Sequence, residues 1–451
     1  MLDIISLTVC LGSILKPSQV TQLLDIINAF YLVPYATTTR SLSRYTDCSL
    51  RSLFRFLSAQ YDWVTISVRF FHFFRCFDPT ARYFLAGDET VEGKSRSKTF
   101  GISRFYSSTH GGTISGICFF GMSIIRVSSG TSYFLGAGQV SYNSEDKARI
   151  AAAKLKQEAG KARAEKGAEK PKGRPLGVKN KPKEENDTAS FRAFKTLFSK
   201  VIDALLLACK GIKLGHMVLD SAYGTADYAN LLKSKGLYLV SKFKSNVHLI
   251  FPYDGEQKGK KKKCYGDKVD VRHLPNKFIS KVEVVDGYEK TYYIFDVYAK
   301  NCFRTQLLNV VVIKSKRLSD GKIGTAILFS NDLSLDCETL ALYYHLRFQI
   351  EFDFRDAKQH FGLSDFKNYK EQNVTNFVNL SFLLCLVSKI QLAYYRKQLN
   401  IEKFSIIDLK LLLKARKNVK NVIKLVRNSP DTIFSDQFAD NFIPDDLINA
   451  A

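Results

Sequence analysis

Three carboxylates in this sequence have the chemistry and the setting of a divalent-cation site. Asp88 follows the short apolar run Tyr83–Gly87, and Asp220 follows the apolar run His216–Leu219. An acid at the end of a buried strand is partly desolvated, and two such acids that lie close together repel each other unless a cation joins them. Glu351 is the third candidate. Hard oxygen ligands of this kind suit Mg²⁺, for which Mn²⁺ can substitute.

Two cations held about 4 Å apart by such carboxylates can activate a nucleophile and stabilise the leaving oxygen at a phosphodiester. Each acid also has an ordinary explanation, because a single Asp at the end of a strand is often a turn former or a helix cap. Spacing along the chain does not by itself bring the three acids together.

Glu351 lies in a segment, residues 343–363, that predicts one helix. Asp336 or Ser334 can cap its start, and Gly362 suits a left-handed residue at its end. An apolar stripe faces the core, and a polar edge runs along the border of that stripe. The stripe consists of Leu346, Ile350, Phe354, Ala357 and Phe361, and the polar edge of Tyr344, Arg347, Glu351, Arg355 and Lys358. The alternative is a solvated face with the ion pairs Arg347–Glu351 and Glu351–Arg355.

Charge and composition limit the class of protein. The 451 residues carry a formal net charge of +24, which favours a polyanionic partner such as nucleic acid or an anionic membrane surface, although it also serves solubility. With 45% hydrophobic and 13% aromatic residues the chain can bury a sizeable core. Nine scattered cysteines without a Cys-x-x-Cys pair argue for a reducing compartment and against a disulfide frame or a zinc site.

Membrane insertion and secretion are not expected from the apolar segments. The segment Met1–Lys16 is apolar but has no basic residues before its apolar run, so a buried helix is expected rather than a signal peptide. The run Ser381–Val387 is too short to cross a bilayer. We therefore expect a soluble, intracellular protein.

The N-terminal part reads as helical. Two short segments, 37–44 and 49–59, have the size of a helix-turn-helix, with Arg51 and Arg55 on one face of the second. Strands are predicted after residue 82, and again from about 246 to 333. The predicted strands are Tyr83–Gly87, ending at Asp88, Thr113–Phe120, Ser132–Val140, His216–Leu219, Tyr238–Lys242, Ile279–Val285, Thr291–Val297, Leu307–Ile313 and Thr325–Ser330. Long helices are predicted at 191–209, 374–399 and 405–426.

Two basic segments interrupt this pattern. Between Lys147 and Lys183 there are thirteen Lys or Arg residues against three Glu. Within it, Lys172 and Arg174 belong to a Lys-Gly-Arg-Pro-Leu-Gly stretch that resembles the core of an AT-hook, which lies in a narrow minor groove. The alternative is a solvated, flexible insertion. Lys260 and Lys261 belong to a second basic loop, 258–263.

The polar edge has the spacing Tyr-x2-Arg-x3-Glu-x6-Lys, formed by Tyr344, Arg347, Glu351 and Lys358. This resembles the signature of the DDE insertion-sequence transposases of the IS-four type, in which it surrounds the catalytic Glu. Asp88-Glu89-Thr90 resembles the first-Asp region, and Asp220-Ser221-Ala222-Tyr223-Gly224 resembles the second, in the right order. Two departures are Glu89, where the family often has Asp, and Phe348, where it often has Trp.

The resemblance implies an α/β fold, a ribonuclease-H-like catalytic core interrupted by a strand-rich insertion, with a helical N-terminal domain and a helical C-terminal segment. Asp88 would lie on the first strand, Asp220 on the fourth, and Glu351 on a helix packed against the sheet. The expected parts are a DNA-binding domain (1–80), the first part of the core (81–225, with the basic insertion 145–187), the strand-rich insertion (226–335), the catalytic helix and end of the core (336–400), and a C-terminal helical region (401–451).

The resemblance also implies a function. Asp88, Asp220 and Glu351 would be catalytic residues and Mg²⁺ ligands, while Tyr344, Arg347, Lys358 and Arg355, with Lys172, Arg174, Lys260 and Lys261, would bind DNA. The partners would be double-stranded DNA, as transposon terminal inverted repeats and as target, and a second copy of the chain. A bacterial cytoplasm and its nucleoid would be the location. The alternatives are an inactive DNA-binding relative and a ribonuclease-H-like nuclease without strand transfer.

Overall fold

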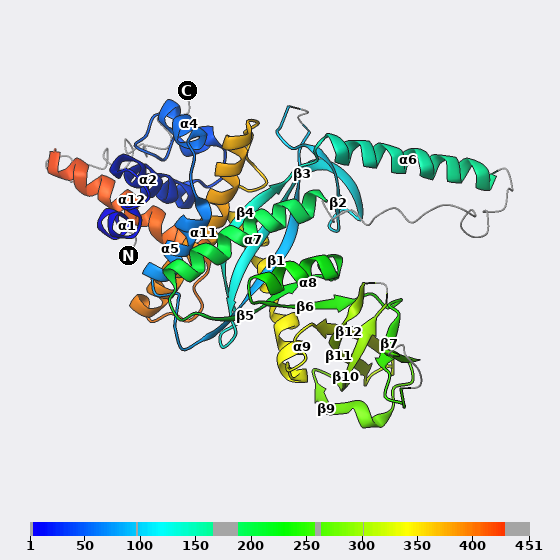
Figure 1. Cartoon of the computed structure of the whole chain (residues 1–451). Coiled ribbons are helices and arrows are strands. Elements are labelled where there is room, and N and C mark those ends of the chain that lie inside the picture. Colours follow the sequence, from blue (N-terminus) through cyan, green and yellow to red (C-terminus); the bar gives the residue numbers. More distant parts are fainter. Residues whose placement is uncertain (1–2, 96–97, 166–187, 258–262, 301, 429–451) are drawn as a thin grey trace.

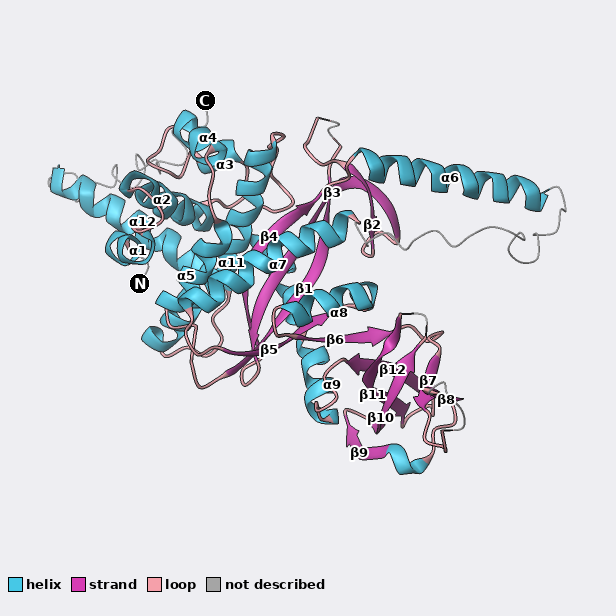
Figure 2. Cartoon of the chain, viewed as in Figure 1, coloured by secondary structure: helices cyan, strands magenta, loops and turns pink. Residues whose placement is uncertain are grey.

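The computed structural model describes residues 3–95, 98–165, 188–257, 263–300 and 302–428. The fold is mixed α/β, built on one 12-stranded mixed sheet. Helices from both ends of the chain gather on one side of this sheet's core, and a strand-rich lobe lies on the other side (Figure 1; Figure 2).

The N-terminal region is helical. Its elements are α1 (Ile4–Leu11), α2 (Pro17–Leu32), α3 (Thr39–Leu42), α4 (Leu50–Ser58) and α5 (Trp63–Phe73). Ser49 caps α4 by accepting a hydrogen bond from the backbone N–H of Ser52, and Arg51 and Arg55 are exposed on that helix. The predicted helix at 37–44 is shorter in the structure, because Thr38 is its cap and the backbone N–H of Thr37 donates to Asp365 instead.

The first six strands form the core of the sheet. They are β1 (Arg82–Gly93), β2 (Ser103–Ser107), β3 (Gly112–Arg126), β4 (Thr131–Val140), β5 (Lys213–Leu219) and β6 (Tyr238–Phe243). Five of them follow the order β4-β3-β1-β5-β6, with β3 antiparallel to β4 and β1, and with β5 and β6 parallel to β1. The sixth, β2, is antiparallel to the start of β3. The prediction that the first strand ends at Asp88 is wrong, because β3 pairs with β1 as far as Gly93.

Helices cover both faces of this core. On one face lies α7 (Ala189–Ala208), whose Phe194 ring is 5.4 Å from that of Phe120 on β3. On the other lie α10 (Gln349–His360) and α11 (Glu371–Leu399), and the Phe382 ring of α11 stacks 4.0 Å from that of Phe134 on β4. Alternation of side chains along the strands therefore supplies two apolar faces.

The strand-rich lobe continues the same sheet. Its elements are β7 (Leu249–Pro252), β8 (Tyr265–Lys268), β9 (Ile279–Val285), β10 (Tyr288–Ala299), β11 (Phe303–Arg317) and β12 (Ile323–Ser330). Strand β12 is antiparallel to β6, so backbone hydrogen bonds run from the core into the lobe. The short helix α8 (Ala226–Ser234) lies between β5 and β6 in the sequence. The basic residues Lys260 and Lys261 lie outside the described residues.

The basic insertion begins with a projecting helix, α6 (Ser144–Glu165), which extends away from the body of the protein (Figure 1). Its base is fixed by Asp146, which is 6% exposed and forms an ion pair with Arg192 of α7. This ion pair ties the base of α6 to α7. Lys172 and Arg174 lie outside the described residues.

The predicted helix 343–363 is two helices. Asp336 caps α9 (Cys337–Leu346) as predicted, accepting from the backbone N–H of Thr339, and α10 begins at Gln349. Between them the backbone bonds tighten from the i−4 to the i−3 pattern, as in the bond from Phe348 N to His345 O. One continuous helix was therefore the wrong prediction, because a residue period of 3.6 does not detect a local break.

Helix α11 joins the N-terminal helices to the sheet. The side chain of Asn376 accepts from Trp63 Nε1 at 2.7 Å and donates to the backbone oxygens of Leu57 and Ala59, both at 2.7 Å. Helix α12 (Ile406–Asn428) packs on α2 and α11. Among the described helices, α11 alone is long and apolar enough to cross a membrane, and 78% of its apolar window is buried inside the protein.

Gly362 is a point where a side chain cannot be accommodated. Its φ is +68°, and an added Cβ would lie 2.5 Å from Thr37 Cβ. We expect Gly362→Ala to lower the free energy of unfolding by roughly 2–4 kcal/mol, since left-handed strain and overpacking add. Urea unfolding measures it. Gly287→Ala is the matched control, because Gly287 has φ +77° with nothing within 4 Å, and should cost about 1 kcal/mol. If the two variants lost equal amounts of unfolding free energy, the close contact between Gly362 and Thr37 would be contradicted.

Candidate active site

The sheet topology brings Asp88 and Asp220 together. Strands β1 and β5 are parallel neighbours, and Gly87 pairs with Leu219 in their register. Asp88 directly follows Gly87 and Asp220 directly follows Leu219, so the two acids lie at the same height along the paired strands. The sequence-based expectation that two strand acids lie side by side therefore has a direct structural basis, namely the parallel pairing of β1 with β5.

Glu351 reaches the same place from α10. Ile350, Phe354 and Ala357 bury one side of the helix, and α10 contacts β1, β3 and β4. Glu351 keeps 38% of its side chain exposed and lines a cleft of about 490 Å³. The lining includes all three acids together with Arg347, Arg355 and Lys358.

Arg347 bridges two of the acids. Its Nη1 lies 2.9 Å from Asp88 Oδ2, and its Nη2 lies 3.1 Å from Glu351 Oε1. The residue is only 8% exposed, and its Nε has no hydrogen-bond partner in the described part of the chain. A buried guanidinium is costly unless acids surround it, so Arg347 and the two carboxylates depend on each other.

Tyr344 contacts the third acid, Asp220. Its hydroxyl donates to Asp220 Oδ1 at 3.2 Å, and the Arg347 guanidinium lies 5.6 Å from its ring. Burial raises the pKa of Tyr344 to about 12, so the phenol stays protonated and serves as a donor. Two members of the Tyr-Arg-Glu-Lys edge therefore contact the two strand acids directly.

Burial raises the pKa of Asp88 to about 6, even though Arg347 and the backbone N–H of Glu89 both act to lower it. Asp220 and Glu351 raise the pKa further through like-charge repulsion. The three carboxylates together therefore carry more negative charge than one guanidinium offsets, which is the condition in which an added cation is favoured.

The three carboxylates are the type of ligand that binds a hard divalent cation, but in this structure they are not arranged as closely as cation ligands. Within the described residues, no group of three His, Cys, Asp or Glu side chains has the geometry to hold a metal ion. The guanidinium of Arg347 lies between Asp88 and Glu351 instead. Carboxylate oxygens are the ligands that Mg²⁺ and Mn²⁺ prefer, so the donor types of the site fit such an ion.

The remaining predicted site residues differ in their contacts. Lys358 lies 2.7 Å from Glu92 Oε1 and lines the cleft. Arg355 also lines the cleft, but it lies 3.8 Å from Asp356 and over the ring of Phe352, so the ion pair with Glu351 considered from the sequence is not formed. Lys172, Arg174, Lys260 and Lys261 fall outside the described residues, and the structure says nothing about them.

Sequence reasoning missed a buried network beneath α10. Asp353 is fully buried on α10, accepts from Ser123 Oγ of β3 at 2.8 Å, and forms an ion pair with Lys389 of α11. Lys389 also donates to the backbone oxygen of Ser132 at 2.7 Å. The available signal was an acid three residues after Ile350, on the apolar side of α10. The network fixes the rotation of the helix that carries Glu351.

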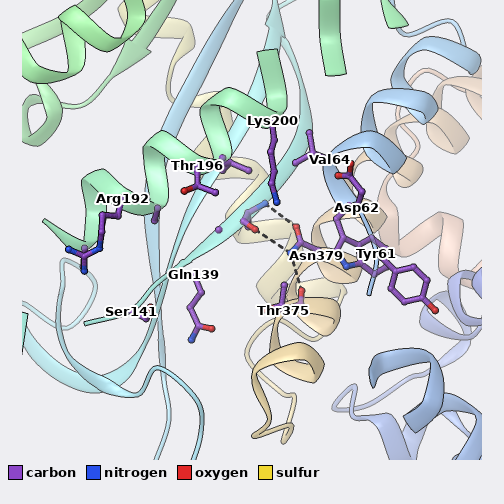
Figure 3. Close-up of a pocket in the computed structure, with 16 residues that line it drawn as sticks. Tyr61, Asp62, Val64, Gln139, Ser141, Arg192, Thr196, Lys200, Thr375 and Asn379 are labelled. Carbon is purple, nitrogen blue, oxygen red and sulfur yellow. Dashed lines mark hydrogen bonds between the residues drawn. The ribbon is translucent and has the colours of Figure 1, made fainter. Parts of the chain in front are cut away.

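A second hollow, of about 350 Å³, lies beside β4 and is lined by residues of α5, α7 and α11 (Figure 3). Several of its polar groups already have structural roles. Asp62 caps α5, and Asn379 exchanges two hydrogen bonds with the backbone of Ala137. It holds no convergent acids, so the cleft at Asp88 is the candidate active site.

The chain matches the family model of the transposase DDE domain over residues 172–387. The match contains Asp220 and Glu351 with their Tyr, Arg and Lys neighbours, while Asp88 lies before it. It suggests transposase function and implies a ribonuclease-H-like fold for this region. No curated protein matches the chain.

The buried pair beneath α10 can be tested by removing its cation. Lys389→Met leaves Asp353 charged and unpaired, so we expect the free energy of unfolding to fall by about 3–5 kcal/mol. Urea unfolding is the measurement. Lys397→Met, at an exposed position of the same helix, should change stability by at most about 0.5 kcal/mol. Adding Asp353→Asn to Lys389→Met should recover part of the loss, and no recovery would show that the charge is not the cause.

Proposed function

We propose that this protein is an insertion-sequence transposase that cuts DNA at the transposon ends and joins them to target DNA. The observation that carries the proposal is the meeting of Asp88, Asp220 and Glu351 in one cleft. Tyr344 and Arg347 contact these acids, and Lys358 lies in the same lining. The match to the transposase DDE domain family supports the same conclusion.

The three carboxylates would hold Mg²⁺ or Mn²⁺. When bound there, such ions supply an activated water and offset the charge on the leaving oxygen of a phosphodiester. The protein's own contribution is position. The β1–β5 pairing sets the distance between the two strand acids, and the buried Asp353–Lys389 pair sets the rotation of α10.

Arg347 would exchange partners when DNA enters. Its fork of donors matches two carboxylate oxygens in this structure, and the same fork matches two phosphate oxygens. Moving it from Asp88 and Glu351 to the DNA backbone would free both acids for cations. Tyr344 and Lys358 would fix the backbone on either side, the first by its hydroxyl and the second as a point charge. The scissile phosphate would thereby be held against the acids.

The full reaction proposed is cut-and-paste transposition. A first hydrolytic cut would release a 3′-OH, which then serves as nucleophile, and the same three acids would act in the joining step. The substrate is double-stranded DNA bearing the terminal inverted repeats, and the pairing of two ends requires at least a dimer. The net charge of +24 supports the polyanionic partner. A bacterial nucleoid is the proposed location.

Cleavage of a labelled duplex that carries the element's own end and flank, in Mg²⁺ or Mn²⁺, tests this function. We expect Glu351→Gln to lower cutting by at least about 10³-fold while DNA binding persists, because a cation ligand is lost. Glu402→Gln, at an exposed position, is the matched control. Cutting without joining by the wild type would indicate a nuclease. DNA binding without cutting by both the wild type and Glu351→Gln would indicate an inactive relative.

Arg347 and a divalent cation compete for the same acids. In the absence of DNA, we expect Arg347→Met to tighten Mn²⁺ binding by roughly tenfold, about 1.4 kcal/mol, because the cation no longer displaces a guanidinium. Calorimetric titration measures this without any reaction. Arg355→Met removes the same charge from the rim of the cleft and should change the affinity by about twofold or less, since the group is exposed and screened. Unchanged or weaker Mn²⁺ binding by Arg347→Met would contradict the competition.

A further inference from the structure

A large basic hollow lies where the N-terminal helices meet the loop that follows α10. Its volume is about 660 Å³, and its lining comes from α3, α4, residues 367–370 and the start of α11. Three of the lining residues are cations, namely Arg40, Lys367 and Lys370, and none is acidic. This hollow has no part in the candidate active site described above.

The three cations are available to a ligand. Each is exposed, and within the described residues none of the three side chains makes a hydrogen bond or an ion pair. Four neutral polar side chains of the wall are paired with each other, since Thr39 Oγ1 donates to Asn368 Oδ1 at 3.3 Å and Asn373 donates to Ser58 at 3.3 Å. The hollow therefore has fixed neutral walls and uncommitted positive charges.

The two sides of the hollow are held rigidly together. The backbone N–H of Thr37 donates to Asp365 at 2.8 Å, and Gly362 lies so close to Thr37 that no Cβ fits between them. Both contacts join the N-terminal helices to the loop that ends α10. A ligand bound in the hollow would thus be positioned relative to the helix that carries Glu351.

A chain of contacts connects this hollow with the acidic cleft. Lys358, in the cleft, pairs with Glu92, which accepts from Ser364 Oγ at 2.8 Å. Lys94 donates to the backbone oxygens of Ser364 and Phe366 and lines an intermediate hollow of about 350 Å³. That hollow shares Lys367 with the larger one. Basic residues therefore recur along one path from Asp88 to Arg40.

We propose that the hollow at Arg40, Lys367 and Lys370 binds the phosphodiester backbone of duplex DNA that leads into the acidic cleft. This inference rests on the proposed function and names a contact surface for its substrate. A repeating anion suits the three uncommitted cations of this hollow, whose lining holds no acid, and the contact is independent of DNA sequence. Phe54 and Tyr369, which are 45% and 53% exposed at this hollow, offer apolar faces to the sugars.

The test compares two triple variants that remove the same charge. One is Arg40→Ala/Lys367→Ala/Lys370→Ala. The other is Lys210→Ala/Lys397→Ala/Lys403→Ala, whose side chains are exposed. Lys210 precedes β5, at the opposite end of that strand from Asp220, and Lys397 lies about 40 Å along α11 from Lys370. Binding of a labelled duplex of arbitrary sequence is measured over a range of salt concentrations.

The expected result is a smaller salt dependence for the hollow variant alone. Each lost phosphate contact lowers the slope of log affinity against log salt by about 0.9, so the slope should fall by roughly 2–3 relative to the control triple variant. Equal slopes for the two variants would overturn the proposal. A deficit seen only with a single strand of the same sequence would overturn its assignment to duplex DNA.

Cleavage separates this proposal from the function on which it rests. If the two triple variants have equal salt slopes but Glu351→Gln still abolishes cutting, the transposase proposal stands and the assignment of DNA binding to this hollow is wrong. If Glu351→Gln cuts as well as the wild type while the slopes differ, DNA binding at the hollow stands and the catalytic proposal is wrong. Circular dichroism of both triple variants confirms that the exposed substitutions leave the fold intact.

Discussion

Repulsion among three carboxylates is the constraint on which the rest of the site depends. Asp88, Asp220 and Glu351 can share one cleft only if positive charge lies among them, and in this structure Arg347 provides it, 2.9 Å from Asp88 and 3.1 Å from Glu351. The arrangement stabilises Arg347 as much as it stabilises the acids, because a guanidinium that is 8% exposed needs charged partners. The cleft therefore holds a balance of charges, and under the proposed function a phosphate and a divalent cation would together replace the guanidinium.

The fold supports this balance with elements that are distant in the sequence. Two parallel strands deliver two acids at one level, and α10 delivers the third. Helix α10 is itself held by Asp353, whose partners come from β3 and α11. Helix α11 in turn holds the N-terminal helices through Asn376. The position of Glu351 thus depends on contacts made across the whole described core, which explains why a short sequence motif needs so large a protein around it.

Sequence patterns predicted the elements better than their contacts. Alternation and apolar runs located β9 and β12 and the helix at 371–399, since these signals are local. The extension of β1 past Asp88 depends on pairing with β3, so it could not be found in a local window. The break after Leu346 leaves the 3.6-residue period of apolar positions intact, so that period gave no sign of it. Periodicity placed Arg347 on the polar edge and offered Glu351 as its i,i+4 partner, and the structure shows that ion pair. The contact of Arg347 with Asp88 spans 259 residues of sequence, so no local pattern reveals it. The Asp353–Lys389 pair joins residues whose relation appears only in three dimensions.

The bond between Trp63 and Asn376 spans 313 residues of sequence, and this has a consequence for synthesis. The N-terminal helices leave the ribosome long before α11 is synthesised. Until then, the apolar surface that packs on α11 is uncovered and the Trp63 N–H lacks its acceptor Asn376. High sequence separation of this kind slows folding and leaves early products exposed to aggregation. A gene copy whose reading frame stops before α11 would therefore yield an N-terminal fragment that lacks its packing partner. Integrity of the far end of the gene thus decides whether its beginning can fold.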